Sequence, residues 1–200
     1  SFASRMESLF INTDFAPQLL LAEAIEPMRY ALGATIAVKR KALEEIGSFR
    51  AIRDVLADDY FLGLKLSEAG YQIRLSSSIV TITCEEKVFS DFWNHQLRWA
   101  RTFHSVRPVS LSTIAIHGPF WALLFLIAMH FSLGALGVLA LVLGTRVGMA
   151  RVMLGKVLKL PELLADAWLV PLKDLVMTGV YFASLTGRTV LWGGRKFRRG

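Results

Sequence analysis

Cysteine is nearly absent from the sequence, because Cys84 is the single one among 200 residues. An intramolecular disulfide is therefore excluded, and this composition is typical of a folded part in a reducing compartment. A lone cysteine in an apolar strand is usually an inert core residue, and we interpret Cys84 in this way. The sequence also lacks the basic, apolar and small-residue regions of a signal peptide.

Charged residues are missing from a long central stretch, residues 108–145, which has no Lys, Arg, Asp or Glu. A spanning helix needs roughly twenty apolar residues, so this stretch can form two short spans with a tight turn at Ser132 and Gly134. By the positive-inside rule, basic residues on both sides place both flanks in the cytoplasm. These flanking residues are Arg101, Arg107, Arg146, Arg151, Lys156 and Lys159. The alternative is a hairpin buried in the core of a soluble domain.

Acidic residues are scarce in the second half of the chain. Residues 1–107 hold 13 Lys and Arg against 13 Asp and Glu, whereas residues 108–200 hold 10 against 3, which accounts for the net charge of +7. The excess lies beside apolar stretches and is not interleaved with aromatic residues on a soluble sheet. It therefore favours an anionic membrane surface over nucleic acid as the partner.

Residues 161–192 are apolar but interrupted by Pro171, Lys173 and Asp174. A single span here would place the basic tail outside the cytoplasm. We therefore expect interfacial or re-entrant helices, with a third span as the alternative. The aromatic anchors at the interface would be Trp168, Tyr181 and Trp192.

The first half has the pattern of a mixed α/β domain. Pro17 and Pro27 bracket a short apolar helix, and Gly47 and Gly70 end two further helices, over residues 41–46 and from Asp59 to about 69. Small and apolar residues predict a buried strand of the parallel type, and alternation predicts two more. These strands would cover residues 30–38, 71–75 and 79–84. Ser90-Asp91 would begin a helix that runs to about residue 102.

Two patterns could carry chemistry. Asp58-Asp59 stands where a helix begins, and His95-Gln96-Leu97-Arg98-Trp99 lies on a later helix whose turns place His95, Arg98 and Trp99 on one surface. An acidic pair at a helix start is often only a cap. An Arg-Trp pair before a membrane hairpin is often only a surface anchor. The sequence shows no Gly-rich phosphate loop, no Ser-His-Asp arrangement and no metal-ligand spacing among its histidines.

Taken together, Ala57-Asp58-Asp59-Tyr60 and His95-x-x-Arg98-Trp99 resemble the acceptor half of inverting membrane glycosyltransferases. The chain is most similar to the ceramide glucosyltransferase family and its bacterial relatives, including the hopanoid-lipid glycosyltransferases. The stretch that begins Gly33-Ala34-Thr35 resembles the acceptor-side strand of that family. Two departures stand out: His95 replaces a usual Gln or Arg, and no Asp-x-Asp nucleotide-sugar motif is present.

The resemblance implies a fold of the α/β GT-A type, of which residues 1–107 would be the acceptor-side portion. Residues 108–145 would form the membrane hairpin, and residues 146–200 the basic interfacial or re-entrant helices and a cytoplasmic tail. The donor-binding portion would precede Ser1. It would hold the divalent metal, Mg²⁺ or Mn²⁺, that the resemblance implies, with ligands outside this chain. We therefore expect the 200 residues alone to be inactive.

The resemblance also implies roles for the candidate residues. Asp59 would be the catalytic base that takes the proton of the acceptor hydroxyl, and Asp58 a supporting acid or helix cap. Arg98 would pair with the leaving diphosphate, with His95 as a further hydrogen-bond donor. Trp99 and the segment Gly33-Ala34-Thr35 would line the acceptor pocket.

The expected reaction moves glucose or N-acetylglucosamine from a UDP-sugar to a hydroxyl of a membrane lipid such as ceramide or a hopanoid. The expected location is a multi-pass membrane protein with its catalytic part on the cytoplasmic face, most simply in a bacterial inner membrane. One alternative is a processive polysaccharide synthase. Another is a non-catalytic membrane-anchored module that binds lipid or a partner.

Overall fold

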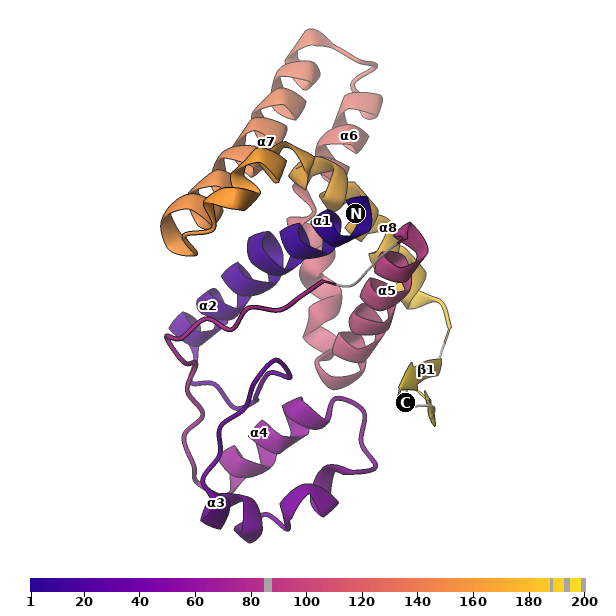
Figure 1. Cartoon of the computed structure of the whole chain (residues 1–200). Helices are drawn as coiled ribbons and strands as arrows, with labels where there is room; N and C mark the ends of the chain where they lie inside the picture. The colour runs from indigo at the N-terminus through magenta and orange to yellow at the C-terminus, as the bar shows by residue number, and fades with distance from the viewer. Residues whose placement is uncertain (85–87, 188, 193–194, 199–200) are drawn as a thin grey trace. The chain divides into compact units, whose positions relative to one another are not determined.

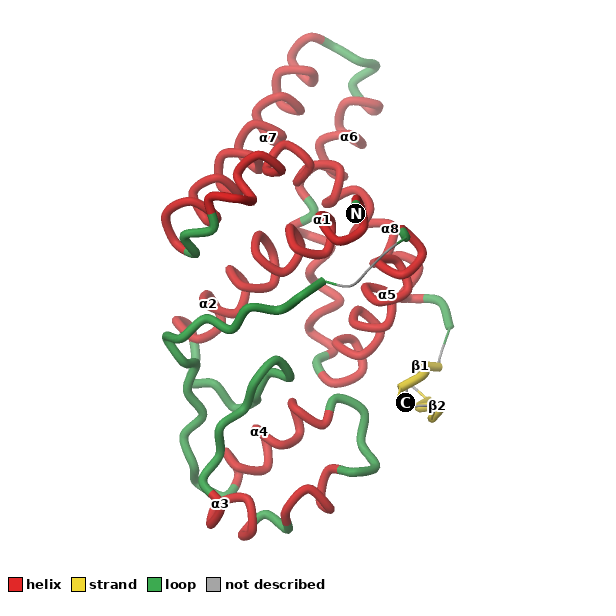
Figure 2. Tube along the Cα trace, viewed as in Figure 1, coloured by secondary structure: helices red, strands yellow, loops and turns green. Residues whose placement is uncertain are grey.

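The computed structural model describes residues 1–84, 88–187, 189–192 and 195–198 (Figures 1 and 2). The chain divides into two compact units, Ser1–Pro17 with Cys84–Gly200, and Gln18–Thr83. Each unit is described by itself. The domain boundaries predicted at residues 107 and 145 stay predictions.

A long helical segment opens the chain. Helix α1 (Phe2–Phe10) is capped by Ser1, whose Oγ accepts from the Ser4 amide at 3.1 Å. A π-helical turn (Ile11–Phe15) leads directly into α2 (Ala16–Ile25). This wide turn immediately precedes Pro17, which has no N–H to donate to the carbonyl four residues earlier. The short apolar helix predicted between Pro17 and Pro27 is confirmed as α2, and the π-helical turn joins it to α1.

The larger unit is a bundle of helices. Helix α5 (Phe89–Val106) packs against α1 and against α8 (Val170–Leu185), which also contacts α6 (Gly118–Ala128) and α7 (Leu133–Val152) (Figure 1). Two 3₁₀ segments (Pro108–Ile116 and Pro161–Leu169) and a π-helical turn (Met153–Val157) connect these helices. The helix predicted to begin at Ser90-Asp91 begins at Phe89 instead. The Asp91 carboxylate reaches back to accept from the Val88 amide at 3.3 Å.

Helices α6 and α7 form the predicted apolar hairpin. Its turn lies at His130 and Phe131, which have positive φ, and Ser132 then caps α7 by accepting from the Ala135 amide. Among the described helices, Leu133–Val157 is long and apolar enough to cross a membrane, whereas Gly118–Ala128 is shorter. The described residues thus supply one helix of spanning length where two short spans were predicted.

The hairpin leaves large apolar side chains uncovered. Leu133 is 85% exposed and Leu141 70% exposed, and only 11% of the most apolar window of Leu133–Val157 is buried. A core helix of a soluble domain would bury such residues. The alternative of a hairpin buried inside a soluble domain therefore does not fit the described residues.

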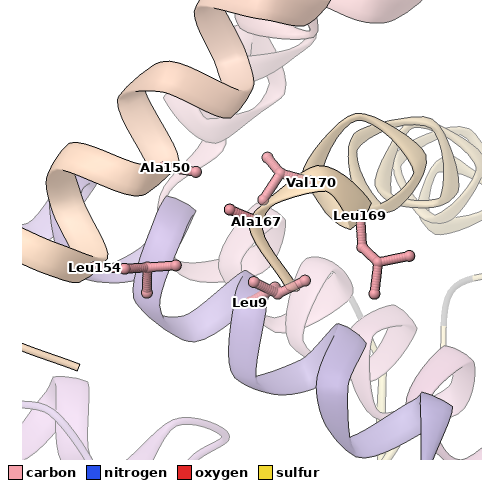
Figure 3. Packing of buried hydrophobic residues seen from close by; sticks show 6 residues of the cluster. All are labelled: Leu9, Ala150, Leu154, Ala167, Leu169 and Val170. Atoms are coloured by element: carbon pink, nitrogen blue, oxygen red, sulfur yellow. The ribbon is translucent and has the colours of Figure 1, made fainter. Parts of the chain in front are cut away.

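One apolar cluster joins the first helix to the C-terminal helices (Figure 3). Leu9 from α1 meets Leu154 and Ala150 on one side and the end of the second 3₁₀ segment on the other. The cluster comprises Leu9, Ala150, Leu154, Ala167, Leu169 and Val170, all of them buried. Burying these side chains holds α1 against the helices that follow the hairpin.

Four charged residues of the larger unit form a network in which Lys173 and Asp174 are buried and Asp14 and Arg146 are partly buried. Arg146 of α7 donates to Asp174 Oδ2 at 2.6 Å and to Asp14 Oδ1 at 2.8 Å. Lys173, whose side chain is fully buried, pairs with Asp14 and with Asp174 Oδ1, the latter at 2.9 Å. Two acids thus neutralise two bases, which is the condition under which charges can be buried. We call these four residues the ion network.

We expect Asp174→Asn to lower the free energy of unfolding by about 3–5 kcal/mol, because it leaves buried cations short of a partner. Burial alone would raise the pKa of Asp174, but hydrogen bonds from Arg146 and the charge of Lys173 outweigh burial and lower it below the ordinary 3.8. The stability from Asp174 is therefore complete above pH 3.8 and is lost as the pH falls through the lower native pKa.

Thermal unfolding in detergent between pH 7 and pH 3 measures this effect. The gap between wild type and Asp174→Asn should narrow at the acid end. Asp166→Asn is the control, since Asp166 pairs with the exposed Arg5. An equal loss in this control, or a gap that does not change with pH, would contradict the prediction.

The smaller unit contains α3 (Arg40–Glu45), a 3₁₀ turn (Ser48–Ile52) and α4 (Asp58–Glu68). Gly47 and Gly70 have φ values of 90° and 89°, which confirms that these glycines end the two predicted helices. A core of buried side chains from the three helical segments lies between them. These side chains are Ala42, Ile52, Leu62 and Leu66.

The three predicted strands are absent. Residues 30–38, 71–75 and 79–84 are irregular or turn segments, and Gly33 and Ala34 lie in a turn. The sheet in the described part of the chain is the two-stranded antiparallel pair β1 (Thr189–Trp192) and β2 (Arg195–Arg198). A strand needs a neighbour for its backbone groups, and the described residues supply none for these three segments. The α/β GT-A fold is therefore not confirmed.

Gly63 lets α4 approach another backbone closely. A Cβ added at Gly63 would lie 2.1 Å from the Ala31 nitrogen and 2.4 Å from the Tyr30 carbonyl carbon. Next to this contact, the rings of Tyr30 and Tyr60 stack with centroids 5.7 Å apart. Gly63 therefore fixes where the start of α4 lies relative to the segment that begins at Tyr30.

We expect Gly63→Ala to destabilise the smaller unit by about 1–3 kcal/mol, because the helix and the backbone must separate. Gly137→Ala is the matched control, since a Cβ there meets nothing within 4 Å and alanine favours helix. Limited proteolysis and thermal unfolding would report the difference. Equal stability of the two variants would show that the contact is not tight.

Candidate active site

The two acidic residues lie in the first turn of α4. The residue that precedes the helix is Ala57, with a left-handed φ of 60°, so Asp58 is not the cap that the sequence allowed. Asp58 instead accepts from the Asp59 amide through Oδ1 at 3.1 Å. Carboxylates are favoured at this position by the free amides and the dipole of the helix. Asp58 is exposed and Asp59 is half-buried.

The segment Gly33-Ala34-Thr35 lies beside this helix start. A Cβ added at Gly33 would lie 3.1 Å from Asp59 Oδ2, so the structure brings together Gly33 and the predicted base. Ala34 and Thr35 are exposed, and the Thr35 hydroxyl donates to the Ala34 carbonyl at 2.7 Å. Within the described residues no hydrogen bond or ion pair engages the Asp59 carboxylate.

We expect Gly33→Ala to displace the Asp59 carboxylate by a few tenths of an ångström and to lower kcat about tenfold, since small misplacements of catalytic groups are costly. Stability should change little, because Gly33 is exposed. Sugar-transfer assays and thermal unfolding test both statements. Glu68→Gln, at the exposed far end of α4, is the control. Unchanged kcat in Gly33→Ala would mean that Asp59 is not held against this turn.

A second group of candidate residues lies on α5 and lines an open pocket of about 520 Å³. His95 and Arg98, both predicted, are joined there by Arg101, one turn further along the helix. The remaining lining residues are Asn94, Leu97, Thr189 and Val190. Two guanidinium groups and an imidazole on one wall suit an anionic ligand.

The two arginines of this pocket are held differently. Burial lowers the pKa of Arg98 from its ordinary value, while the negative charge of Glu7 opposes the change. An arginine remains charged under such a shift. Arg101 donates to the Thr186 carbonyl at 2.8 Å. Sequence reasoning missed Arg101 as a site residue, although its spacing of three from Arg98 places both on one helix face.

The ring of Trp99 packs against Phe10 and Phe15, near the start of the chain. Its ring meets Phe15 at 5.7 Å and Phe10 at 6.3 Å between centroids, and it contacts His95 edge-on at 5.0 Å. It is not among the residues that line the pocket at His95 and Arg98. Trp99 thus packs α5 against α1 and the π-helical turn, and its role as an acceptor wall stays a prediction.

Glu7 of α1, which the sequence did not single out, contacts the motif on α5. Glu7 of α1 is 1% exposed; its Oε2 accepts from Gln96 Nε2 at 2.8 Å, and its Oε1 lies 3.2 Å from His95 Nδ1. Glu7 Oε1 makes no hydrogen bond among the described residues, so its contact with His95 is one of distance and charge, and the hydrogen bond is the one from Gln96. The signal available in the sequence was weak: one acid on the apolar face of an amphipathic helix.

The candidate residues thus form two groups. Gly33 and Asp59 belong to the unit Gln18–Thr83, and His95, Arg98 and Trp99 to the other. No set of three or more His, Cys, Asp and Glu in the described ranges could hold a metal ion. The described residues therefore do not form a site for the implied divalent metal, whose ligands were expected outside this chain.

Residues 1–199 match the family model described as glycosyl transferase family 21, and the chain belongs to this family. The suspected resemblance to the ceramide glucosyltransferase-like family is thereby confirmed. Membership implies, in general terms, a sugar donor and a lipid acceptor. No solved structure matches the chain.

Proposed function

We propose that the protein transfers glucose or N-acetylglucosamine from a UDP-sugar to the hydroxyl of a membrane lipid, such as ceramide or a hopanoid, with inversion at the anomeric carbon. The observation that carries this proposal is the half-buried Asp59 carboxylate beside the exposed turn at Gly33, in a chain of this glycosyltransferase family.

Asp59 is the base in this proposal. Its carboxylate lies against the turn at Gly33 and makes no hydrogen bond within the described residues, so it can accept one from an acceptor hydroxyl. As the proton moves to Asp59, the hydroxyl oxygen bonds to the anomeric carbon and the bond to the diphosphate breaks. Asp58 supports the geometry, because its side chain already accepts from the Asp59 amide.

The leaving diphosphate is assigned to the pocket on α5. Negative charge accumulates on this group as the sugar departs, and preorganised cations stabilise it. Arg98 and Arg101 supply two fixed guanidinium groups, and His95 adds a ring nitrogen.

The membrane is the proposed location of the acceptor. The exposed apolar surface of Leu133–Val157 suits lipid contact, and the basic residues around it suit an anionic headgroup surface. We propose that the catalytic part lies on the cytoplasmic face, in a bacterial inner membrane. Trp168, 68% exposed, is available as an interfacial anchor.

We expect Asp59→Asn to reduce transfer at least 100-fold with the fold intact, since a general base contributes about 10²–10⁴. The assay uses the protein together with its expected donor-binding portion, in liposomes, with labelled UDP-glucose or UDP-N-acetylglucosamine and ceramide or hopanoid acceptors. Asp54→Asn is the matched control, because Asp54 is an exposed acid of the same unit that pairs with the neighbouring Arg53. Full activity of Asp59→Asn would remove Asp59 from the mechanism.

The same assay separates the other candidate functions. A processive polysaccharide synthase would release products of many sugars, whereas the proposed enzyme adds one. A non-catalytic binding module would give no transfer and would keep its binding in Asp59→Asn. The 200 residues by themselves should not turn over, because they contain no Asp-x-Asp donor motif.

A further inference from the structure

Helices α6 and α7 form a hairpin that projects beyond the other helices of the larger unit (Figure 1). The base of this hairpin lies where α6 begins, since a Cβ added at Gly118 would lie 3.4 Å from Val142 Cγ1 on α7. The preceding residue is tied to the bundle, because His117 Nδ1 lies 2.8 Å from Thr178 Oγ1 of α8. Residues 118–145, which we call the hairpin arm, contain no Lys, Arg, Asp or Glu.

The hairpin arm is too short to cross a membrane. Helix α6 has 11 residues, which at the ordinary helical rise extend about 16 Å. The returning helix extends about 20 Å from Leu133 to Arg146, where the side chain is bonded to Asp14 and Asp174 in the ion network. The hydrocarbon core of a bilayer is about 30 Å thick. The full length of Leu133–Val157 would fill it only by drawing the ion network into the lipid, and α6 would still end far short.

The tip of the hairpin arm has apolar side chains where a loop in water would have polar ones. Phe131 is 64% exposed, Leu133 85% exposed and Met129 48% exposed. A turn outside the membrane would leave these side chains in water. His130, the titratable residue of the turn, can enter lipid as the neutral imidazole.

The backbone of the turn makes its hydrogen bonds internally. Four consecutive amides, from Met129 to Ser132, donate to nearby carbonyls at 2.9–3.0 Å. The accepting carbonyls are those of Phe125, Leu126, Ile127 and Met129. Ser132 Oγ then accepts from the Ala135 amide at the start of α7. The bilayer core has no water to bond to an irregular segment, so a turn placed there needs internal partners of this kind.

The base of the hairpin arm has the residues of a membrane surface. Trp168 is 68% exposed and lines an apolar groove of about 610 Å³ with Gly144 and Val147, which flank Arg146. Tryptophan is enriched at the interface between lipid and water. The chain that follows α7 has exposed basic side chains, which suit anionic headgroups. These are Arg151, Lys156 and Lys159.

We propose that α6 and α7 form a monotopic membrane hairpin: the arm enters the bilayer from one face, turns at His130 and Phe131 inside the hydrocarbon, and returns to the same face. Its partner is the acyl-chain region of the lipid, with anionic headgroups at the base. The inference rests on the membrane location in the proposed function and is independent of the reaction. Such a hairpin keeps both flanks on one side and lets the protein take its lipid acceptor from the leaflet on that side.

Side-specific cysteine labelling tests the proposal, with the protein and its expected donor-binding portion in sealed membrane vesicles. In a cysteine-free background that includes Cys84→Ser, the variants Phe131→Cys and Leu133→Cys each report on the tip. Glu162→Cys, at an exposed position beyond the base, is the matched control. A maleimide that cannot cross membranes is added to one face or to the other.

We expect Glu162→Cys to react from one face, and both tip variants to react at least about tenfold more slowly from either face, because the reagent does not enter hydrocarbon. Detergent should restore their labelling. Reaction of a tip variant from the face opposite to Glu162→Cys would show a hairpin that crosses the membrane. Rapid reaction from the same face would place the tip in water. Either result would overturn the proposal.

Nitroxide labels on the same tip cysteines distinguish lipid from a cover of protein. In hydrocarbon the label should collide with dissolved oxygen and be screened from a water-soluble nickel chelate, whereas screening from both would overturn the proposal. The sugar-transfer assay is read separately. A protein whose tip lies in lipid but that transfers no sugar fails the proposed reaction and supports this inference, and a protein that does not stay with the vesicles fails both.

Discussion

The ion network of Asp14, Arg146, Lys173 and Asp174 is the constraint on which the larger unit depends. Its charges can be buried only while the π-helical turn, α7 and α8 are all in place, since each acid contacts both bases. The π-helical turn that carries Asp14 also brings Phe15 against Trp99, and α1 carries Glu7 to His95. The ion network thus holds the π-helical turn and α1 in the positions from which Phe15 contacts Trp99 and Glu7 contacts His95.

In the smaller unit, a close contact between two backbone segments fixes the position of α4. Gly63 lets α4 touch the backbone at Tyr30 and Ala31, and the turn at Gly33 follows directly. The Asp59 carboxylate then lies against Gly33 because no side chain fills the space between them. One unit thus places its acid through the absence of side chains, whereas in the other a buried carboxylate contacts Gln96 and His95 on α5. The proposed reaction needs both, since an inverting transfer requires a base at the acceptor and positive charge at the leaving group.

The sequence predicted best where the signal was local. Gly47 and Gly70 ended their helices as expected because a positive φ is cheapest at glycine. The apolar hairpin was likewise evident, since uncharged length alone defines it. The strand at residues 30–38 failed because a strand depends on a partner that local sequence cannot reveal. Glu7 was missed for a similar reason, because its partners lie about ninety positions away along the chain.

The stereochemistry of the product tests the central claim most directly. A single base at the acceptor and a cationic site for the diphosphate imply one displacement, so an α-linked UDP-sugar must give a β-linked glycolipid. Proton NMR of the purified lipid product reads the anomeric configuration from its coupling constant. The account predicts the β-linked glycolipid alone. An α-linked product would require a double displacement or a front-face mechanism, and would contradict the role assigned to Asp59.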